Sequence, residues 1–127
     1  MRIVKLKGYW DGSDRRSADR FEVDLAVRYY LNGNDASAKG VDISTKGIKL
    51  LLDEKFKKDM PLRLEIKLAG YSDLIRAWGV VAWSSEAAEE SKNAERRLFN
   101  TGIKFTRFHD AGEKKLFDFI AQVANTP

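Results

Sequence analysis

Arginines gather in a short polar stretch near the start of the sequence. The segment "DGSDRRSADRF", residues 11–21, holds Arg15, Arg16 and Arg20 just before the sequence becomes apolar. A guanidinium group presents paired N–H donors that fit phosphate oxygens and the O6/N7 edge of guanine, and it also stacks on bases. The stretch is therefore either a binding segment for an anionic ligand or a solvated basic arm.

A second polar pattern follows on the far side of an apolar segment. It is "DISTKG", in which Asp42, Ser44 and Gly47 are spaced as D-x-S-x-x-G. A carboxylate can accept hydrogen bonds from guanine N–H groups, and a hydroxyl can donate or accept one. Glycine can adopt a positive φ and lets a ligand approach the backbone. Together with the arginines, these groups suit a guanine nucleotide with phosphates.

Catalytic and metal-binding chemistry finds little support in the sequence. His109 is the only histidine, and there is no cysteine to act as a nucleophile or metal ligand. Neither a phosphate-binding loop nor a dinucleotide-binding glycine pattern is present. We therefore expect no enzymatic activity, no catalytic residues, no metal and no cofactor, with His109 as a surface or capping residue.

Composition predicts one soluble globular domain. The 127 residues are 43% hydrophobic and 33% charged, with a net charge of +4. Residues 1–20 hold six Lys and Arg against three Asp, so most of the excess positive charge lies there and would attract phosphate-bearing partners. Because no apolar run reaches the length of a signal peptide or a membrane span, we expect no membrane insertion and a cytoplasmic location.

Alternating apolar residues predict strands that position the two polar motifs. Every second residue from Phe21 to Leu31 is apolar, which is the period of a half-buried strand. Asn-Gly at 32–33 predicts a hairpin, and the second strand, about 36–43, would end in "DISTKG". Further strand patterns occupy 48–52, 62–68, 74–85 and 98–108. Many short strands at close spacing indicate a barrel or a sandwich.

The C-terminal segment has a different period. Leu116, Ile120 and Val123 lie at helical spacing, with Asp110 as the expected N-cap and Glu113 as its capping-box partner. The chain therefore ends in an amphipathic helix that covers an end or an edge of the strands.

Three aromatic residues have separate expected positions. Trp83 shares the predicted inner face of its strand with Val81, so we expect it inside. Tyr9 and Trp10 precede the arginines in a polar segment, and we expect one of them to pack on the strands.

Four motifs in order resemble the PilZ domain family. "RRSADRF" resembles the family's RxxxR motif and "DISTKG" its (D/N)xSxxG motif, while "GVVAW" at 79–83 and "TGIKF" at 101–105 resemble its GxVxW and GIxF strands. The resemblance spans about residues 13–124. Each motif is short, but all four occur in the family's order.

The resemblance implies the fold. It predicts a mainly β protein, a six-stranded antiparallel β-barrel over about 21–108, followed by a C-terminal α-helix over about 110–124. We expect residues 1–12 to form a separate N-terminal arm and the basic segment that leads into the barrel to be flexible.

The resemblance also implies a ligand, because family members bind cyclic di-GMP, a bacterial second messenger. Arg16 and Arg20 would clamp phosphate and guanine from the flexible arm. Asp42 and Ser44 would read a guanine edge, and Gly47 would shape the turn. Arg15 would contact a second, stacked nucleotide, whereas Lys46 is an additional, outward-facing cation.

The expected function is a cyclic di-GMP receptor or adaptor that passes the closure of its arm to an unidentified effector protein, in bacterial motility, biofilm or pilus control. Two alternatives stay open. One is a PilZ-like interaction module that binds no nucleotide, and the other is a general single-stranded nucleic-acid binder. Because the positive charge is local rather than spread along a groove, a nucleic-acid polymer is not expected as a partner.

Overall fold

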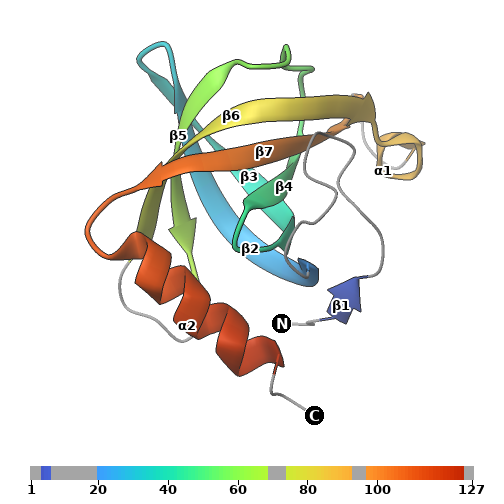
Figure 1. The fold of residues 1–127 in the computed structure, drawn as a ribbon. Coiled ribbons are helices and arrows are strands. Elements are labelled where there is room, and N and C mark those ends of the chain that lie inside the picture. The colour runs from blue at the N-terminus through green and yellow to red at the C-terminus, as the bar shows by residue number, and fades with distance from the viewer. Residues whose placement is uncertain (1–3, 7–19, 69–73, 93–96, 125–127) are drawn as a thin grey trace.

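The computed structural model describes residues 4–6, 20–68, 74–92 and 97–124 (Figure 1). The predicted arm residues Tyr9, Trp10, Arg15 and Arg16 lie outside this part of the chain, as does the predicted boundary between residues 12 and 13. The elements are β1 (Val4–Leu6), β2 (Arg20–Leu31), β3 (Asn34–Ile43), β4 (Gly47–Leu52), β5 (Pro61–Lys67), β6 (Leu74–Glu86), α1 (Ala88–Lys92), β7 (Phe99–Phe108) and α2 (Gly112–Ala124).

Six antiparallel strands close into a barrel, which confirms the predicted fold class. The strands follow the order β2-β3-β4-β7-β6-β5, and β5 pairs back to β2. Closure gives every barrel strand two neighbours over most of its length and so leaves few exposed edges. The short strand β1, which the sequence did not predict, pairs with the first residues of β2 outside this ring.

Alternation along the strands fills the barrel interior. The side chains that gave β2 its strand pattern, among them Leu25, Val27 and Tyr29, are buried in the core. The interior is completed by fully buried residues from the other strands, among them Ile48, Leu64 and Ile103. The helix α2 lies below the barrel in Figure 1 and contributes the buried Leu116 and Phe119 to the same core. Neither described helix is long and apolar enough to cross a membrane.

The turn between β7 and α2 differs from the sequence prediction. The helix begins at Gly112, and the carbonyl of Ala111 accepts the helical hydrogen bond from the Lys115 amide at 3.0 Å. Ala111 therefore occupies the N-cap position predicted for Asp110, and both residues have positive φ. His109 is half-buried rather than a surface or capping residue, because its Nε2 accepts a hydrogen bond from Trp78 Nε1.

The glycine inside β6 allows two strands to approach closely. A Cβ on Gly79 would lie 2.6 Å from Ile103 Cγ2 and 2.8 Å from the carbonyl oxygen of Lys104. Both atoms belong to the neighbouring strand β7, and a backbone oxygen cannot rotate away as the end of a side chain can.

Replacing Gly79 with Ala should destabilise the barrel by about 1–3 kcal/mol, because the methyl group forces the two strands apart. Urea unfolding measures the change in free energy. The matched control is Gly40→Ala, whose Cβ would meet only side-chain atoms, at 3.2–3.3 Å. Equal losses in the two variants would contradict a backbone origin for the Gly79 effect.

Candidate functional site

Arg20 is part of the barrel and not of the preceding arm. It is the first residue of β2 and is only 7% exposed. Its neighbour Phe21 points into the core, so Arg20 projects from the outer face of the strand. The expectation that Arg20 acts from a flexible arm is therefore wrong, because strand pairing and burial hold it in place.

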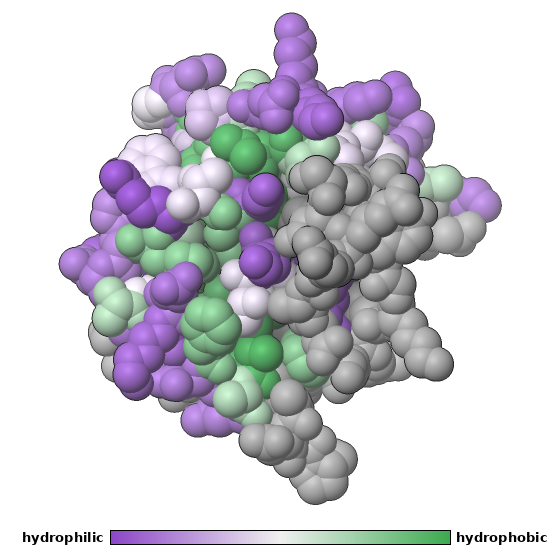
Figure 2. Space-filling view, viewed as in Figure 1, coloured by the Kyte–Doolittle hydropathy of each residue, from purple (hydrophilic) through white to green (hydrophobic). Residues whose placement is uncertain are grey.

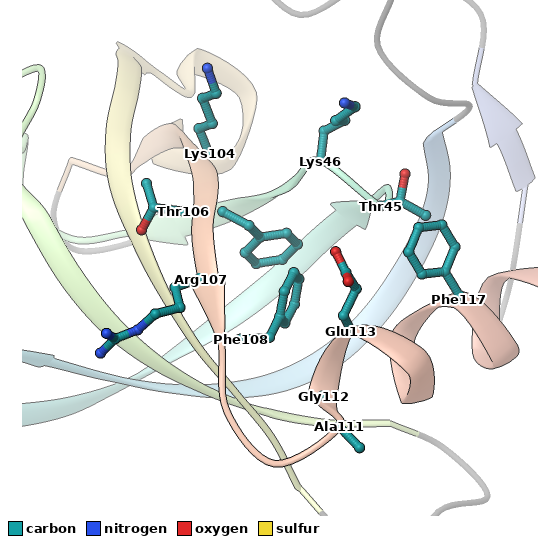
Figure 3. Close-up of a pocket in the computed structure, with 11 residues that line it drawn as sticks. Thr45, Lys46, Lys104, Thr106, Arg107, Phe108, Ala111, Gly112, Glu113 and Phe117 are labelled. Carbon is teal, nitrogen blue, oxygen red and sulfur yellow. The ribbon is translucent and has the colours of Figure 1, made fainter.

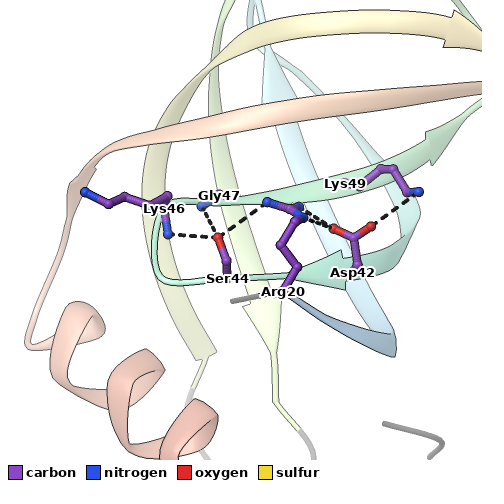
Figure 4. A network of polar contacts seen from close by, with 6 residues as sticks. All are labelled: Arg20, Asp42, Ser44, Lys46, Gly47 and Lys49. Carbon is purple, nitrogen blue, oxygen red and sulfur yellow. Dashed lines mark hydrogen bonds and ion pairs between the residues drawn. The ribbon is translucent and has the colours of Figure 1, made fainter. Parts of the chain in front are cut away.

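A buried ion pair links Arg20 to the second motif (Figure 4). Arg20 donates from Nε to Asp42 Oδ1 at 2.8 Å, and Nη2 contacts the same oxygen. Its Nη1 donates to Ser44 Oγ at 3.4 Å. Lys49 Nζ lies 3.3 Å from the other carboxylate oxygen of Asp42. Residues from β2, β3 and β4 are thus joined on one outer face of the barrel.

The hydroxyl of Ser44 organises the turn between β3 and β4. Its Oγ accepts from the amides of Lys46 at 3.0 Å and Gly47 at 3.2 Å, and the Ser44 amide donates to the Gly47 carbonyl at 2.9 Å. Gly33 is the only described glycine with a positive φ, so Gly47 does not shape the turn through that conformation. What Gly47 contributes is a backbone amide that holds Ser44.

Burial acts on the charge of Arg20. Loss of solvent lowers the pKa of the guanidinium to about 10, and attraction and hydrogen bonding to Asp42 oppose this change only in part. Arg20 is therefore still protonated at neutral pH. Because attraction to Asp42 offsets only part of the effect of burial, negative charge brought close to Arg20 would stabilise its charged form.

A row of paired residues carries the outer face from Asp42 to Trp83. Asp42 pairs with Lys49, Lys49 with Gly102, and Gly102 with Trp83. Their neighbours Ile43, Ile48 and Ile103 are buried in the core, and paired residues in antiparallel strands point to the same side of the sheet. The row therefore faces outward.

Trp83 lies on this outer face, contrary to the expectation that it is inside. An irregularity in β6 between Val81 and Trp83 leaves Ala82 as an additional residue, so Trp83 points to the opposite side from a regular strand. Its ring lies over Gly102, where an added Cβ would be 2.2 Å from Trp83 Nε1. Sequence reasoning missed this position because a bulge reverses the alternation without changing the residue types.

The geometry of the row fits a planar ligand beside the ion pair. Neighbouring strands are about 4.8 Å apart, so the indole over Gly102 lies roughly 10 Å from Asp42. Trp83 Nε1 is buried and has no hydrogen-bond partner among the described residues. The face thus offers an aromatic surface at one end, a paired arginine and carboxylate at the other, and Lys49 between them.

Four of the six predicted site residues lie together. Arg20, Asp42, Ser44 and Gly47 form one network, whereas Arg15 and Arg16 fall outside the described residues. Within the described residues, no group of three His, Asp or Glu side chains is arranged to hold a metal ion.

Asp42→Ala should destabilise the fold by about 3–5 kcal/mol, because it breaks the buried pair by removing the carboxylate that contacts both Arg20 and Lys49. Chemical unfolding measures this loss. Asp35→Ala is the matched control, since it breaks an exposed pair with Arg28 and should cost no more than about 1 kcal/mol. A loss for Asp42→Ala as small as for Asp35→Ala would contradict the claim that the buried pair stabilises the fold more than the exposed pair does.

Comparison with solved structures identifies the same fold in three bacterial proteins. MotI/DgrA, the inhibitor of motility of Bacillus subtilis, is 18% identical with a TM-score of 0.68, over 90% of this chain and 53% of that chain. The K. pneumonia MrkH–c-di-GMP complex is 17% identical with a TM-score of 0.69, over 96% and 63%. The PilZ domain of YcgR from Escherichia coli, with c-di-GMP, is 17% identical with a TM-score of 0.61, over 88% and 92%.

The described fold and the order of its motifs agree with the family comparison. The chain spans only about half the length of MotI and under two thirds of MrkH, but nearly the whole PilZ domain of YcgR. No curated protein matches the sequence. Residues 14–122, which include both polar motifs and all six barrel strands, match the PilZ domain, so the chain belongs to the PilZ domain family.

Proposed function

We propose that the chain is a cyclic di-GMP receptor whose binding site lies on the outer face of the barrel at the Arg20–Asp42–Ser44 network. The observation that carries the proposal is the convergence of these three side chains, from β2, β3 and the turn that follows β3, onto one buried position. Two of the similar solved structures, those of MrkH and the YcgR PilZ domain, contain c-di-GMP. Their ligand supports the proposal for this chain.

The ion pair supplies the groups that a guanine nucleotide needs. In the structure, Arg20 occupies one oxygen of Asp42 with paired N–H donors. A guanine base offers a similar pair of N–H donors to a carboxylate. The nucleotide would replace the guanidinium on Asp42, and Arg20 would turn to a phosphate or to guanine O6/N7. Burial lowers the pKa of Arg20 in spite of its attraction to Asp42, and the negative charge of an incoming phosphate would stabilise the charged guanidinium.

Trp83 extends the same site. Its indole is fixed over Gly102 on the face that carries Asp42, about two strand spacings away. One of the two guanine bases of the dinucleotide would stack on this ring, as bases stack on other aromatic side chains. It would be either the base that Asp42 holds or the second base. Lys49, between them in the row, would lie close to a phosphate.

The arm and the effector complete the proposal. Arg16 precedes Arg20 by four positions, and Arg15 is adjacent to Arg16. We place Arg16 on phosphate or guanine and Arg15 on a second nucleotide, with the segment closing over the ligand. Ordering of a segment by a ligand can create or hide a surface for a partner protein. The domain itself is a receptor and adaptor that acts through that partner, in the control of motility, biofilm or pili.

Calorimetry with cyclic di-GMP tests the site directly. Wild-type protein should bind with micromolar or tighter affinity. Arg20→Ala and Arg16→Ala should each weaken binding about tenfold or more, since one bidentate arginine contact contributes roughly 1–3 kcal/mol. Ser44→Ala should also weaken binding, because it removes the hydroxyl that accepts from Arg20 and holds the turn. Arg28→Ala is the matched control, because Arg28 also lies on β2 but is exposed and pairs with Asp35.

Absence of detectable binding to the folded wild-type protein at tens of micromolar nucleotide would overturn the receptor proposal. The chain would then be a PilZ-like interaction module. Equal binding by single-stranded DNA, competing with the nucleotide, would instead favour the general nucleic-acid binder.

Trp83→Leu should weaken cyclic di-GMP binding about fivefold or more, because stacking on an aromatic ring contributes about 1–3 kcal/mol per base. The control is Trp78→Leu, whose indole is already hydrogen-bonded to His109 near α2 and away from the row. Nucleotide titration should also quench the fluorescence of the Trp78→Leu protein more than that of the Trp83→Leu protein. Unchanged affinity in Trp83→Leu would remove the stacking role.

A further inference from the structure

A recess lies beside the proposed nucleotide site, between β7, the β3–β4 turn and the start of α2 (Figure 3). Its volume is about 600 Å³. Lys46 and Lys104 stand along one rim, the ring of Phe108 lies on the floor, and Glu113 and Phe117 of α2 lie opposite. Phe105 also lines the recess, and its ring packs against that of Phe108.

One wall of the recess is a strand edge. The pairing of β4 with β7 ends at Gly47 and Lys104, yet β7 continues to Phe108 and remains paired with β6. The Phe105 amide still donates to the Lys46 carbonyl in the β3–β4 turn, and over residues 106–108 none of the described strands pairs with β7 on the β4 side. An unpaired edge of this kind can accept an extended peptide through backbone hydrogen bonds.

The floor and the helix side are apolar. The rings of Phe105 and Phe108 lie 5.0 Å apart and pack against the barrel core, while Phe117 of α2 is 50% exposed. Figure 2 shows a band of hydrophobic residues on the face that carries β7 and α2, with hydrophilic residues beside it. Exposed phenylalanine beside an aromatic floor is a favourable contact for a bulky apolar side chain of a partner.

Charge narrows the class of partner. The charged residues that line the recess are Lys46, Lys104, Arg107 and Glu113, so positive charge dominates. Arg107 lies 5.8 Å from the ring of Trp78 and points away from the floor, which leaves the two lysines as the cations on the open rim. Complementarity therefore favours a segment with an acidic residue next to a bulky apolar one.

The recess is joined to the nucleotide site through one turn. Lys46 accepts a hydrogen bond at its carbonyl from the Phe105 amide at 2.8 Å, and its own amide donates to Ser44 Oγ at 3.0 Å. Ser44 Oγ also accepts from Arg20. A ligand that changes the contacts of Ser44 would thus shift the rim of the recess.

We propose that this recess is the docking surface for the effector, which adds an acidic, extended peptide segment to the free edge of β7. The acidic side chain pairs with Lys104 and Lys46, and a bulky apolar side chain packs between Phe105, Phe108 and Phe117. Control of the docking by cyclic di-GMP rests on the proposed function, whereas the docking itself does not.

The test uses a phage-displayed library of random short peptides, selected against the full chain with and without cyclic di-GMP. Selected peptides should carry Asp or Glu beside a bulky apolar residue, and synthetic copies are titrated by fluorescence anisotropy. Lys104→Glu and Phe117→Asp should each weaken binding about tenfold or more. The matched control Lys58→Glu, an exposed lysine in the loop before β5, should leave the affinity unchanged.

Backbone methylation tests the strand addition. One version of a selected peptide is N-methylated at the alternate residues whose amides point toward β7. It should lose binding, because methylation removes the amide donors on the edge that pairs with β7. The alternate set of methylations should have a smaller effect. Equal effects of both sets would contradict docking at a strand edge.

Several results would overturn the proposal. The first two are failure to select any peptide, and peptides that bind the Lys104→Glu and Phe117→Asp variants as tightly as wild type. A dimer in light scattering that Phe117→Asp dissociates would identify a second copy of the chain as the occupant. Binding to phosphatidylglycerol vesicles that Phe117→Asp abolishes would identify a lipid surface instead. Calorimetry with cyclic di-GMP on the same variants separates the two claims. Peptide binding without nucleotide binding would retain the docking surface and reject the receptor, and the converse would reject only the docking surface.

Discussion

The buried ion pair between Arg20 and Asp42 is the constraint on which the site depends. It joins the first residue of β2 to the end of β3, and through Ser44 it reaches the turn into β4. Removing two charges from water is costly, and the pair persists because each partner compensates the other in part. An anionic guanine nucleotide offers both partners a replacement, the phosphate for Arg20 and the base for Asp42. In the proposed function, the nucleotide opens this site by taking over the contacts of both charges.

Closure of the barrel fixes the positions of the residues around this ion pair. Because the strands form a closed ring, their register is fixed on both sides, and the outward row from Asp42 through Lys49 and Gly102 to Trp83 is fixed with it. The Ser44 turn contacts the proposed nucleotide site on one side and the recess beside Phe105 on the other. The barrel therefore carries a candidate ligand site and a candidate output surface that share a single turn.

Much of the fold could be predicted from the sequence, because period-two alternation and the Asn-Gly turn are local signals. The alternation from Phe21 to Leu31 predicted β2 and its buried face, and the motif order predicted the barrel and the C-terminal helix. The side of Trp83 could not be predicted, since it depends on a bulge that is created by pairing with β7. The place of Arg20 was also missed. Its burial follows from long-range contacts with Asp42 and Ser44, which no neighbouring residue indicates.

The most direct test of the central claim observes the Arg20 side chain during a titration with cyclic di-GMP. In a two-dimensional nitrogen–proton NMR spectrum, the Arg20 Nε–H signal is assigned by its loss in Arg20→Lys, and Arg28 Nε–H serves as an internal reference. The account predicts a saturable shift of the Arg20 signal as its bond to Asp42 is exchanged for a bond to the nucleotide, with Arg28 unmoved. An Arg20 signal that stays in place while nucleotide binds would show that the ion pair remains closed and that the ligand binds elsewhere.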